Sequence, residues 1–319
     1  MLTIANFCAK RCGMSFSAAS FVSKSVLSAL TLATAGTIAL VASPIRYSGS
    51  DFLAGEPEKA LNNVIAKTTG ETGQSKLRGS IAGEKELRTD KADFALLMLP
   101  AGGKNIEEVK NGTWRVFPIG YQVAYVAVAS ANPLNEITFE QLASVFGNFA
   151  PKTAKNWEEL GAAGFSPALS PCTGDLARTN AVTYFQRKAL PNFALRSAVR
   201  ALASDENAFK EIVNNPGTIA IVGKQIPAGV PIKMLAVADN REDPNATAYA
   251  PIFTNIYNND YPLTIPLYIV YPAKNRQMLK PVLSYLYSQE MANKLAEAGF
   301  LPLEPKLREQ FQKGIDNIK

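Results

Sequence analysis

The sequence predicts a mixed α/β fold of two domains with a cleft between them, and three observations support this. Short runs of β-branched and aromatic residues alternate along the chain with segments of helical periodicity, which is typical of α/β architecture. Two long apolar strands, near residues 123–130 and 263–271, bracket a middle block of ordinary domain size. The chain of 319 residues is 47% hydrophobic and 19% charged, a composition that indicates a globular protein with a buried core.

The two long strands also predict how the domains are connected. A chain that leaves one domain, builds a second and then returns crosses between them twice, and two crossings make a hinge. We therefore predict domain I over residues 43–128 and 266–319, and domain II over residues 129–265. A hinge between two α/β domains would allow the cleft to close on a ligand.

The first half of domain I is predicted as strand, helix, strand, helix and strand. Ile45–Ser48 is a short apolar strand, and Pro57–Thr68 follows as a helix because its apolar residues recur on one helical face. A second strand ends at Leu77, and Gly83–Thr89 has the composition of a short helix. Asp93–Leu99 is a nearly continuous apolar run, as expected of a strand buried on both faces.

The remaining elements continue the alternation of strands and helices. Val123–Ser130 is strongly β-prone and stops at an Asn-Pro pair. Thr138–Phe146 is an amphipathic helix with Thr138 at its N-cap. Further predicted elements are helices over Thr179–Leu190 and Asp205–Asn214, strands over Thr218–Val222 and Tyr261–Tyr271, and a helix pair within Gln277–Ala298.

The N-terminal residues 1–42 carry three basic residues and no acidic ones. The uncharged run Val26–Ala42 has 17 residues, follows a lysine and ends in small residues, which is the pattern of a secretory signal peptide. The run is close to the minimum length for crossing a membrane, so a retained anchor is the alternative. Cleavage after Ala35 or near Ala42 fits this pattern, and Met14 is a second candidate initiator. We expect the mature chain to be exported.

Residue usage argues against several classes of function. The chain contains no histidine, which removes Ser-His-Asp and Cys-His catalysis and histidine metal sites. Its three cysteines, Cys8, Cys12 and Cys172, are too few for a disulfide scaffold or a four-cysteine zinc site. Without residues 1–42 the chain has 30 basic and 27 acidic residues that alternate along the sequence, which indicates a solvated surface. We expect no enzyme activity, no metal or cofactor and no nucleic-acid partner.

Ser50 and Ser80 occupy matching places, each just after a predicted strand. Open α/β sheets bind ligands at the carboxyl ends of their strands, so both serines are candidate ligand contacts. A serine at a strand–helix junction also caps helices, and capping is the alternative for both. Asp51, next to Ser50, is either a helix N-cap or a hydrogen-bond acceptor for a ligand.

Four segments resemble the periplasmic phosphate-binding protein of ABC transporters. They are the strand–loop Gly49-Ser50-Asp51-Phe52, the stretch Ile137–Leu160, the turn Pro216–Ala220, and Tyr261–Tyr268 followed by Ala296–Pro302. The segments span nearly the whole mature chain in the order of that family. The resemblance implies the two-domain type II periplasmic binding protein fold, with two hinge crossover strands and an interdomain cleft.

The resemblance also implies a function. The protein would act in the periplasm as a monomer, capture a small oxyanion, with phosphate as the first candidate, and deliver it to an ABC transporter permease. It would use no cofactor and perform no chemistry. The alternative is a scaffold or sensor of the same fold that binds a different ligand or none.

The family binds its oxyanion with backbone N–H groups at helix N-termini, with hydroxyl groups and with one arginine. Carried over by position, the resemblance implies a ligand site made of Ser50, Asp51, Ser80, Arg178, Thr179 and Asn180. The family's acidic residue, which accepts the proton of a monohydrogen anion, falls near Met98, where this chain has no acid. Asp51 is the substitute that the sequence offers, and such an acceptor favours phosphate over sulfate.

Overall fold

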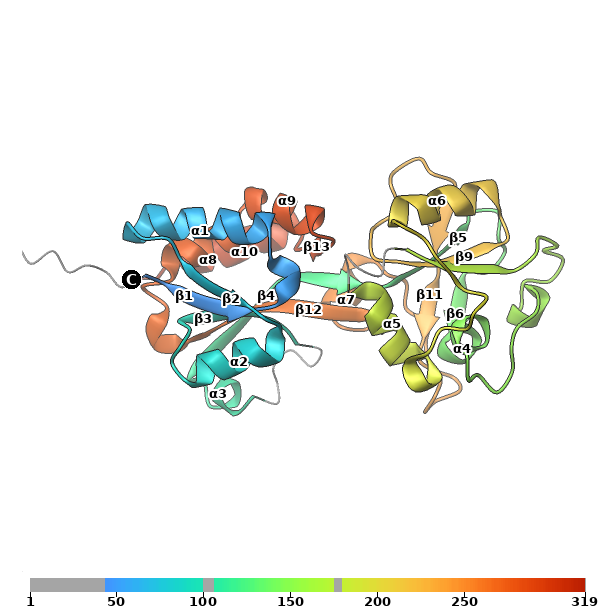
Figure 1. The fold of residues 1–319 in the computed structure, drawn as a ribbon, viewed down its shortest axis with the longest axis horizontal. Helices are drawn as coiled ribbons and strands as arrows, with labels where there is room; N and C mark the ends of the chain where they lie inside the picture. The colour runs from blue at the N-terminus through green and yellow to red at the C-terminus, as the bar shows by residue number, and fades with distance from the viewer. Residues whose placement is uncertain (1–43, 100–105, 175–179, 319) are drawn as a thin grey trace, which may run out of the picture. The chain divides into compact units, whose positions relative to one another are not determined.

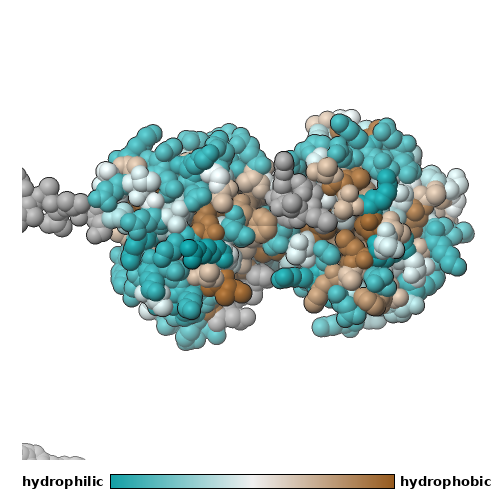
Figure 2. All heavy atoms as spheres, in the orientation of Figure 1, coloured by the Kyte–Doolittle hydropathy of each residue, from teal (hydrophilic) through white to brown (hydrophobic). Residues whose placement is uncertain are grey.

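A computed structural model describes residues 44–99, 106–174 and 180–318. Ala42–Lys319 forms one compact unit, and the signal peptide predicted over residues 1–42 lies outside the described residues. None of the described helices combines the length and hydropathy needed to cross a bilayer. Hydrophilic side chains cover most of the face shown in Figure 2, as the alternating charges of the sequence predict.

The first sheet of the described residues has six strands in the order β13-β4-β12-β3-β1-β2 (Figure 1). They are β1 (Arg46–Gly49), β2 (Gln74–Leu77), β3 (Phe94–Met98), β4 (Trp114–Val123), β12 (Thr264–Pro272) and β13 (Leu301–Pro302). Strand β1 pairs in parallel with β2 and β3, whereas β12 runs antiparallel to β3 and β4. The carboxyl ends of β1, β2 and β3 therefore meet at one edge of the sheet.

Helices cover both faces of this sheet (Figure 1). One face carries α1 (Glu56–Thr69), α8 (Lys280–Leu286), α9 (Gln289–Glu297) and α10 (Pro305–Asp316), and the other carries α2 (Ser80–Arg88) and α3 (Glu107–Lys110). The core between these layers is apolar, and the rings of Tyr47 and Phe94 stack in it with their centroids 5.0 Å apart. A single-turn helix, η1 (Asp51–Leu53), follows β1 directly.

The second sheet has the strand order β10-β5-β9-β7-β8 among the described residues. Its strands are β5 (Tyr125–Ala129), β7 (Ser170–Thr173), β8 (Arg200–Ala201), β9 (Thr218–Val222) and β10 (Ile232–Met234). The helices of this part are α4 (Phe139–Phe146), α5 (Ala181–Ala189) and α6 (Asp205–Asn214), and β6 (Glu136–Thr138) pairs with β11 (Ala236–Ala238). Helix α7 (Phe253–Tyr257) precedes the return to β12.

The chain passes from the first sheet to the second at Ala124, which separates β4 from β5. The Ala124 amide donates to the carbonyl oxygen of Leu263 at 2.9 Å, and the Tyr261 hydroxyl donates to the Ala124 carbonyl at 2.8 Å. The outgoing and returning connections are thus bonded to each other. The strand predicted over Val123–Ser130 is β5, and its start is placed too early, because Val123 ends β4 and the chain changes sheet at Ala124. The domain boundaries near residues 128 and 265 stay a prediction.

The helices with a strong local signal appear where the sequence predicts them. Helix α6 and strand β9 have the predicted bounds. Thr138 caps α4 as predicted: its hydroxyl accepts from the Gln141 amide at 3.2 Å, while the Gln141 side chain accepts from the Thr138 amide at 2.8 Å. This reciprocal pair is a capping box, which satisfies two backbone donors at once.

Strand β4 was not predicted, and two of its residues explain why. Pro118 and Gly120 interrupt its apolar pattern, and both residue types are unfavourable inside a strand. The register of β4 with β12 shifts between Leu267, which pairs with Gly120, and Tyr268, which pairs with Pro118. This irregularity accommodates the proline, because a residue without an N–H group is tolerated where the ladder is interrupted.

Candidate functional site

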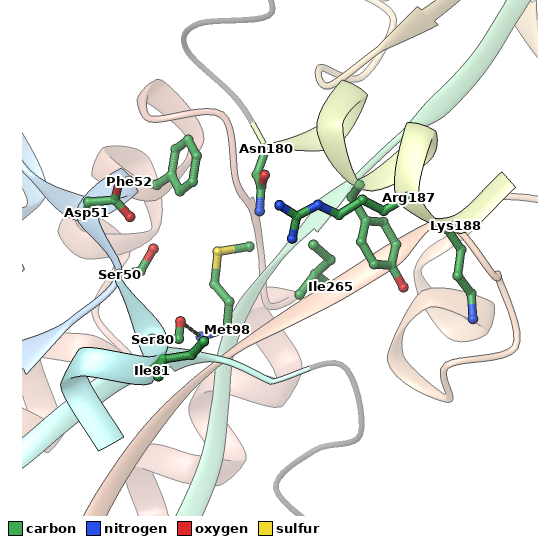
Figure 3. Close-up of a pocket in the computed structure, with 11 residues that line it drawn as sticks. Ser50, Asp51, Phe52, Ser80, Ile81, Met98, Asn180, Arg187, Lys188 and Ile265 are labelled. Carbon is green, nitrogen blue, oxygen red and sulfur yellow. Dashed lines mark hydrogen bonds between the residues drawn. The ribbon is translucent and has the colours of Figure 1, made fainter. Parts of the chain in front are cut away.

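One cavity of about 440 Å³ collects side chains from both parts of the described fold (Figure 3). It is lined by Ser50, Asp51, Phe52, Ser80, Ile81, Met98, Asn180, Tyr184, Arg187, Lys188 and Ile265. Four of the six predicted ligand residues, Ser50, Asp51, Ser80 and Asn180, therefore lie around the same space. The other two, Arg178 and Thr179, lie outside the described residues.

The first group of donors is at the start of η1. Ser50 is 1% exposed, its amide donates to the Leu96 carbonyl at 2.8 Å, and its side chain does not cap the helix. The amides of Asp51 and Phe52 have no acceptor among the described residues, because the first amides of a helix precede its first internal hydrogen bond. These two N–H groups are available to a ligand.

The second group is at the start of α2, which begins at Ser80, three residues earlier than predicted. Gly79 occupies the N-cap with φ of 98°, so capping by the Ser80 side chain is excluded. The Ser80 hydroxyl oxygen instead accepts from the Met98 amide at 2.8 Å, which leaves its proton free to be donated. The amides of Ser80 and Ile81 precede the first bond of the helix, from Gly83 to Gly79 at 3.0 Å, and find no described acceptor.

The two groups of donors lie close together because α2 packs tightly on the end of β1 at two glycines. Gly49 ends β1 and Gly83 lies in α2, and a Cβ atom added to Gly83 would lie 2.7 Å from the Cα atom of Gly49. Two hydrogen bonds join the same segments: the Ser48 hydroxyl donates to the Gly83 carbonyl at 3.1 Å, and the Gly79 amide donates to the Gly49 carbonyl at 2.9 Å. The helix start can approach the strand end because Gly83 has no side chain.

Helix α5 supplies the third side of the cavity. Asn180 is its N-cap, and Tyr184, Arg187 and Lys188 follow at helical spacing on the same face. The Arg187 guanidinium lies beside Asn180 and extends toward Met98 in Figure 3. Arg187 is exposed and forms no hydrogen bond or ion pair with another described residue, so its donors are free.

Sequence reasoning missed Arg187 and Lys188. The spacing of positions 180, 184, 187 and 188 was the signal that could have found them, since these residues share one helix face. The cavity carries two cations and, among its described lining residues, the single acid Asp51. The start of α5 adds partial positive charge, as does the start of α2. The electrostatics of the cavity therefore favour an anion.

The known proteins that this chain resembles agree with this architecture. Residues 33–290 match the family model of the PBP superfamily domain. The chain belongs to the PBP superfamily. Protein SphX of Synechococcus elongatus is 25% identical to it over 271 residues, which is 81% of this chain and 74% of that protein.

Two solved structures show the same fold as this PBP superfamily member. A possible phosphate binding protein from Planctomyces limnophilus has a TM-score of 0.64 and 18% identity, and the match covers 88% of this chain and all of that one. An ABC-type phosphate transport receptor from Vibrio cholerae has a TM-score of 0.52 and 18% identity, over 81% of this chain and 100% of that one. The predicted two-domain periplasmic binding protein fold is confirmed.

Proposed function

We propose that this protein captures a small tetrahedral oxyanion of the phosphate class in the cavity between η1, α2 and α5, and delivers it to an ABC importer. One observation carries the proposal: the amides at the starts of η1 and α2 and the guanidinium of Arg187 line one cavity, and none of them has a partner among the described residues. Backbone N–H groups at helix N-termini bind anions without a metal.

Each donor has a distinct part in binding. The amides of Asp51, Phe52, Ser80 and Ile81 would bond oxygens on the side of the first sheet, together with the hydroxyls of Ser50 and Ser80. Arg187 would approach from α5 and bond two oxygens at once, since its planar donors match a phosphate edge. Asp51 would accept the proton of a monohydrogen anion.

The relatives support the role in transport. The Vibrio cholerae structure is described as an ABC-type phosphate transport receptor, and it shares this fold. We infer export to the periplasm through the signal peptide of residues 1–42, followed by action as a monomer with a transporter permease as partner. Binding without chemistry is favoured because the chain has no histidine and its cavity contains no cysteine among the described lining residues.

A titration tests the proposal directly. The protein is recovered from the extracytoplasmic fraction of cells that express the full chain, stripped of bound ligand, and titrated calorimetrically with phosphate and then with sulfate. We expect heat of binding with phosphate. If neither anion binds, capture of an unsubstituted oxyanion is wrong, and the alternative of a scaffold or sensor that binds a different ligand or none is favoured.

Arg187→Ala tests the contribution of the guanidinium. Loss of hydrogen bonds to a charged group costs about 1.5–3 kcal/mol, so we expect oxyanion affinity to fall about 10- to 150-fold. Arg276→Ala is the matched control, since Arg276 is also exposed but lines a different cavity. Equal affinities of the two variants would show that Arg187 does not contact the ligand.

A further inference from the structure

The centre of the cavity is apolar, although its rim is rich in donors. Its described lining residues include the apolar side chains of Phe52, Ile81, Met98 and Ile265. Met98 ends strand β3 and its thioether projects into the space between the two serines and Arg187 (Figure 3). Ile81 is 89% exposed in the first turn of α2, so it offers apolar surface that no part of the described chain covers.

An unsubstituted phosphate fits this centre poorly. It has four oxygens, and at neutral pH at least one of them carries a proton that needs an acceptor. Asp51 can accept that proton from an oxygen on the η1 side, but an oxygen that faces Met98 and Ile265 meets only the Met98 sulfur, a weak acceptor, among the described lining residues. An oxygen that loses water against Met98 and Ile265 without gaining a hydrogen bond weakens binding.

The size of the cavity also exceeds that of a bare oxyanion. Its volume of about 440 Å³ lies in the range of pockets that take small organic ligands. A bare oxyanion of five heavy atoms is smaller than such ligands and would leave part of the cavity unfilled. The remaining space borders the apolar side chains.

We propose that the preferred ligand is a phosphorus oxyanion with three free oxygens and one short alkyl substituent. This inference rests on the proposed function and names its substrate class. The three oxygens bond the helix-start amides, the serine hydroxyls and Arg187, while the alkyl group replaces the fourth oxygen and lies on Met98 and Ile265. An alkylphosphonate and an alkyl phosphate monoester share this chemistry.

A ligand series on the unmodified protein tests the inference. The stripped protein is titrated with phosphate, sulfate, methyl-, ethyl- and propylphosphonate, and monoethyl phosphate. We expect about a fourfold gain in affinity for each added methylene that is buried, and tighter binding of ethylphosphonate than of phosphate or sulfate. Propylphosphonate and monoethyl phosphate differ only in that the ester has an oxygen in place of the methylene attached to phosphorus. A comparison of their affinities shows whether the protein prefers an alkylphosphonate or an alkyl phosphate monoester.

The outcomes distinguish the preference for an alkyl-substituted ligand from oxyanion capture itself. Tighter binding of phosphate than of all the alkyl ligands overturns the inference but leaves oxyanion capture standing. If no member of the series binds, the proposed function itself fails.

Two substitutions at Met98 test whether this side chain sets the preference. Met98→Leu keeps an apolar surface and is expected to retain the preference for ethylphosphonate. Met98→Asp supplies an acceptor for the proton of phosphate and a charge against the alkyl group, so the affinity ratio of ethylphosphonate to phosphate should fall at least tenfold. Circular dichroism checks the folding of both variants, and Met98→Gln replaces the aspartate variant if that does not fold. An unchanged ratio would show that Met98 does not face the ligand.

Discussion

Gly83→Ala tests how closely helix α2 packs on the end of strand β1, on which the donor arrangement depends. An alanine Cβ atom at this position would lie 2.7 Å from the Gly49 Cα atom and 2.8 Å from the Leu97 Cδ2 atom. The nearer neighbour is backbone, which cannot rotate away, so the helix has to shift. Overpacking of this kind costs about 1–3 kcal/mol, whereas the higher helix propensity of alanine returns about 1 kcal/mol. We expect a net loss of up to about 2 kcal/mol in the free energy of unfolding.

Gly314→Ala is the matched control. Gly314 also lies inside a helix, α10, but it is exposed and a Cβ atom there would have no neighbour within 4 Å. Only helix propensity acts at this position, so we expect a gain of up to about 1 kcal/mol. The same chemical change should therefore have opposite signs at the two glycines.

Urea unfolding followed by far-ultraviolet circular dichroism measures both effects, provided that the slope of the transition is unchanged. A Gly83→Ala protein that is stabilised as much as Gly314→Ala would refute the close approach of α2 to β1. Calorimetry on the same variant adds a functional readout, because a shifted α2 moves the Ser80 and Ile81 amides and should weaken oxyanion binding.

Two further predictions concern titratable groups. A hydrogen bond from Lys224 at 2.8 Å is the main cause that lowers the pKa of Glu206 from 4.5 to about 2. The stability this contributes is present above about pH 4.5 and lost as the pH falls toward 2, and solvent exposure limits it to less than about 1 kcal/mol. Glu206→Gln should be less stable than the wild type at pH 7, and this difference should shrink as the pH falls toward 2; an equal difference at both pH values would contradict this. Burial raises the pKa of the Cys172 thiol to about 12, so it should resist a thiol-specific disulfide reagent at pH 8 until the chain is unfolded. Rapid labelling of the folded protein would contradict that expectation.

Local signals in the sequence were sufficient for many of the elements. Helix α6, strand β9 and the Thr138 cap of α4 were predicted correctly, because periodicity and capping depend on residues close together in the chain. Strand β4 was missed because Pro118 obscures its pattern, and the shifted register with β12 that accommodates this proline involves residues far away in sequence.

For the candidate site, too, the sequence predicts some features and not others. Ser50 and Ser80 could be proposed from sequence, because each follows a strand whose carboxyl end is a usual place for ligands. Their hydrogen-bonding roles could not, since the Ser80 hydroxyl accepts from the Met98 amide, 18 residues further along the chain.

The sequence by itself determined the α/β class, the order of most elements and two of the strand ends that meet at the cavity. Only the tertiary structure decided that Arg187 and Met98 share that cavity with the serines. An exposed arginine on a helix has the same local pattern whether it faces water or a ligand, and an apolar strand end has the same pattern whether it faces a core or a cavity. The difference depends on which distant segment packs opposite, and that is a property of the folded chain.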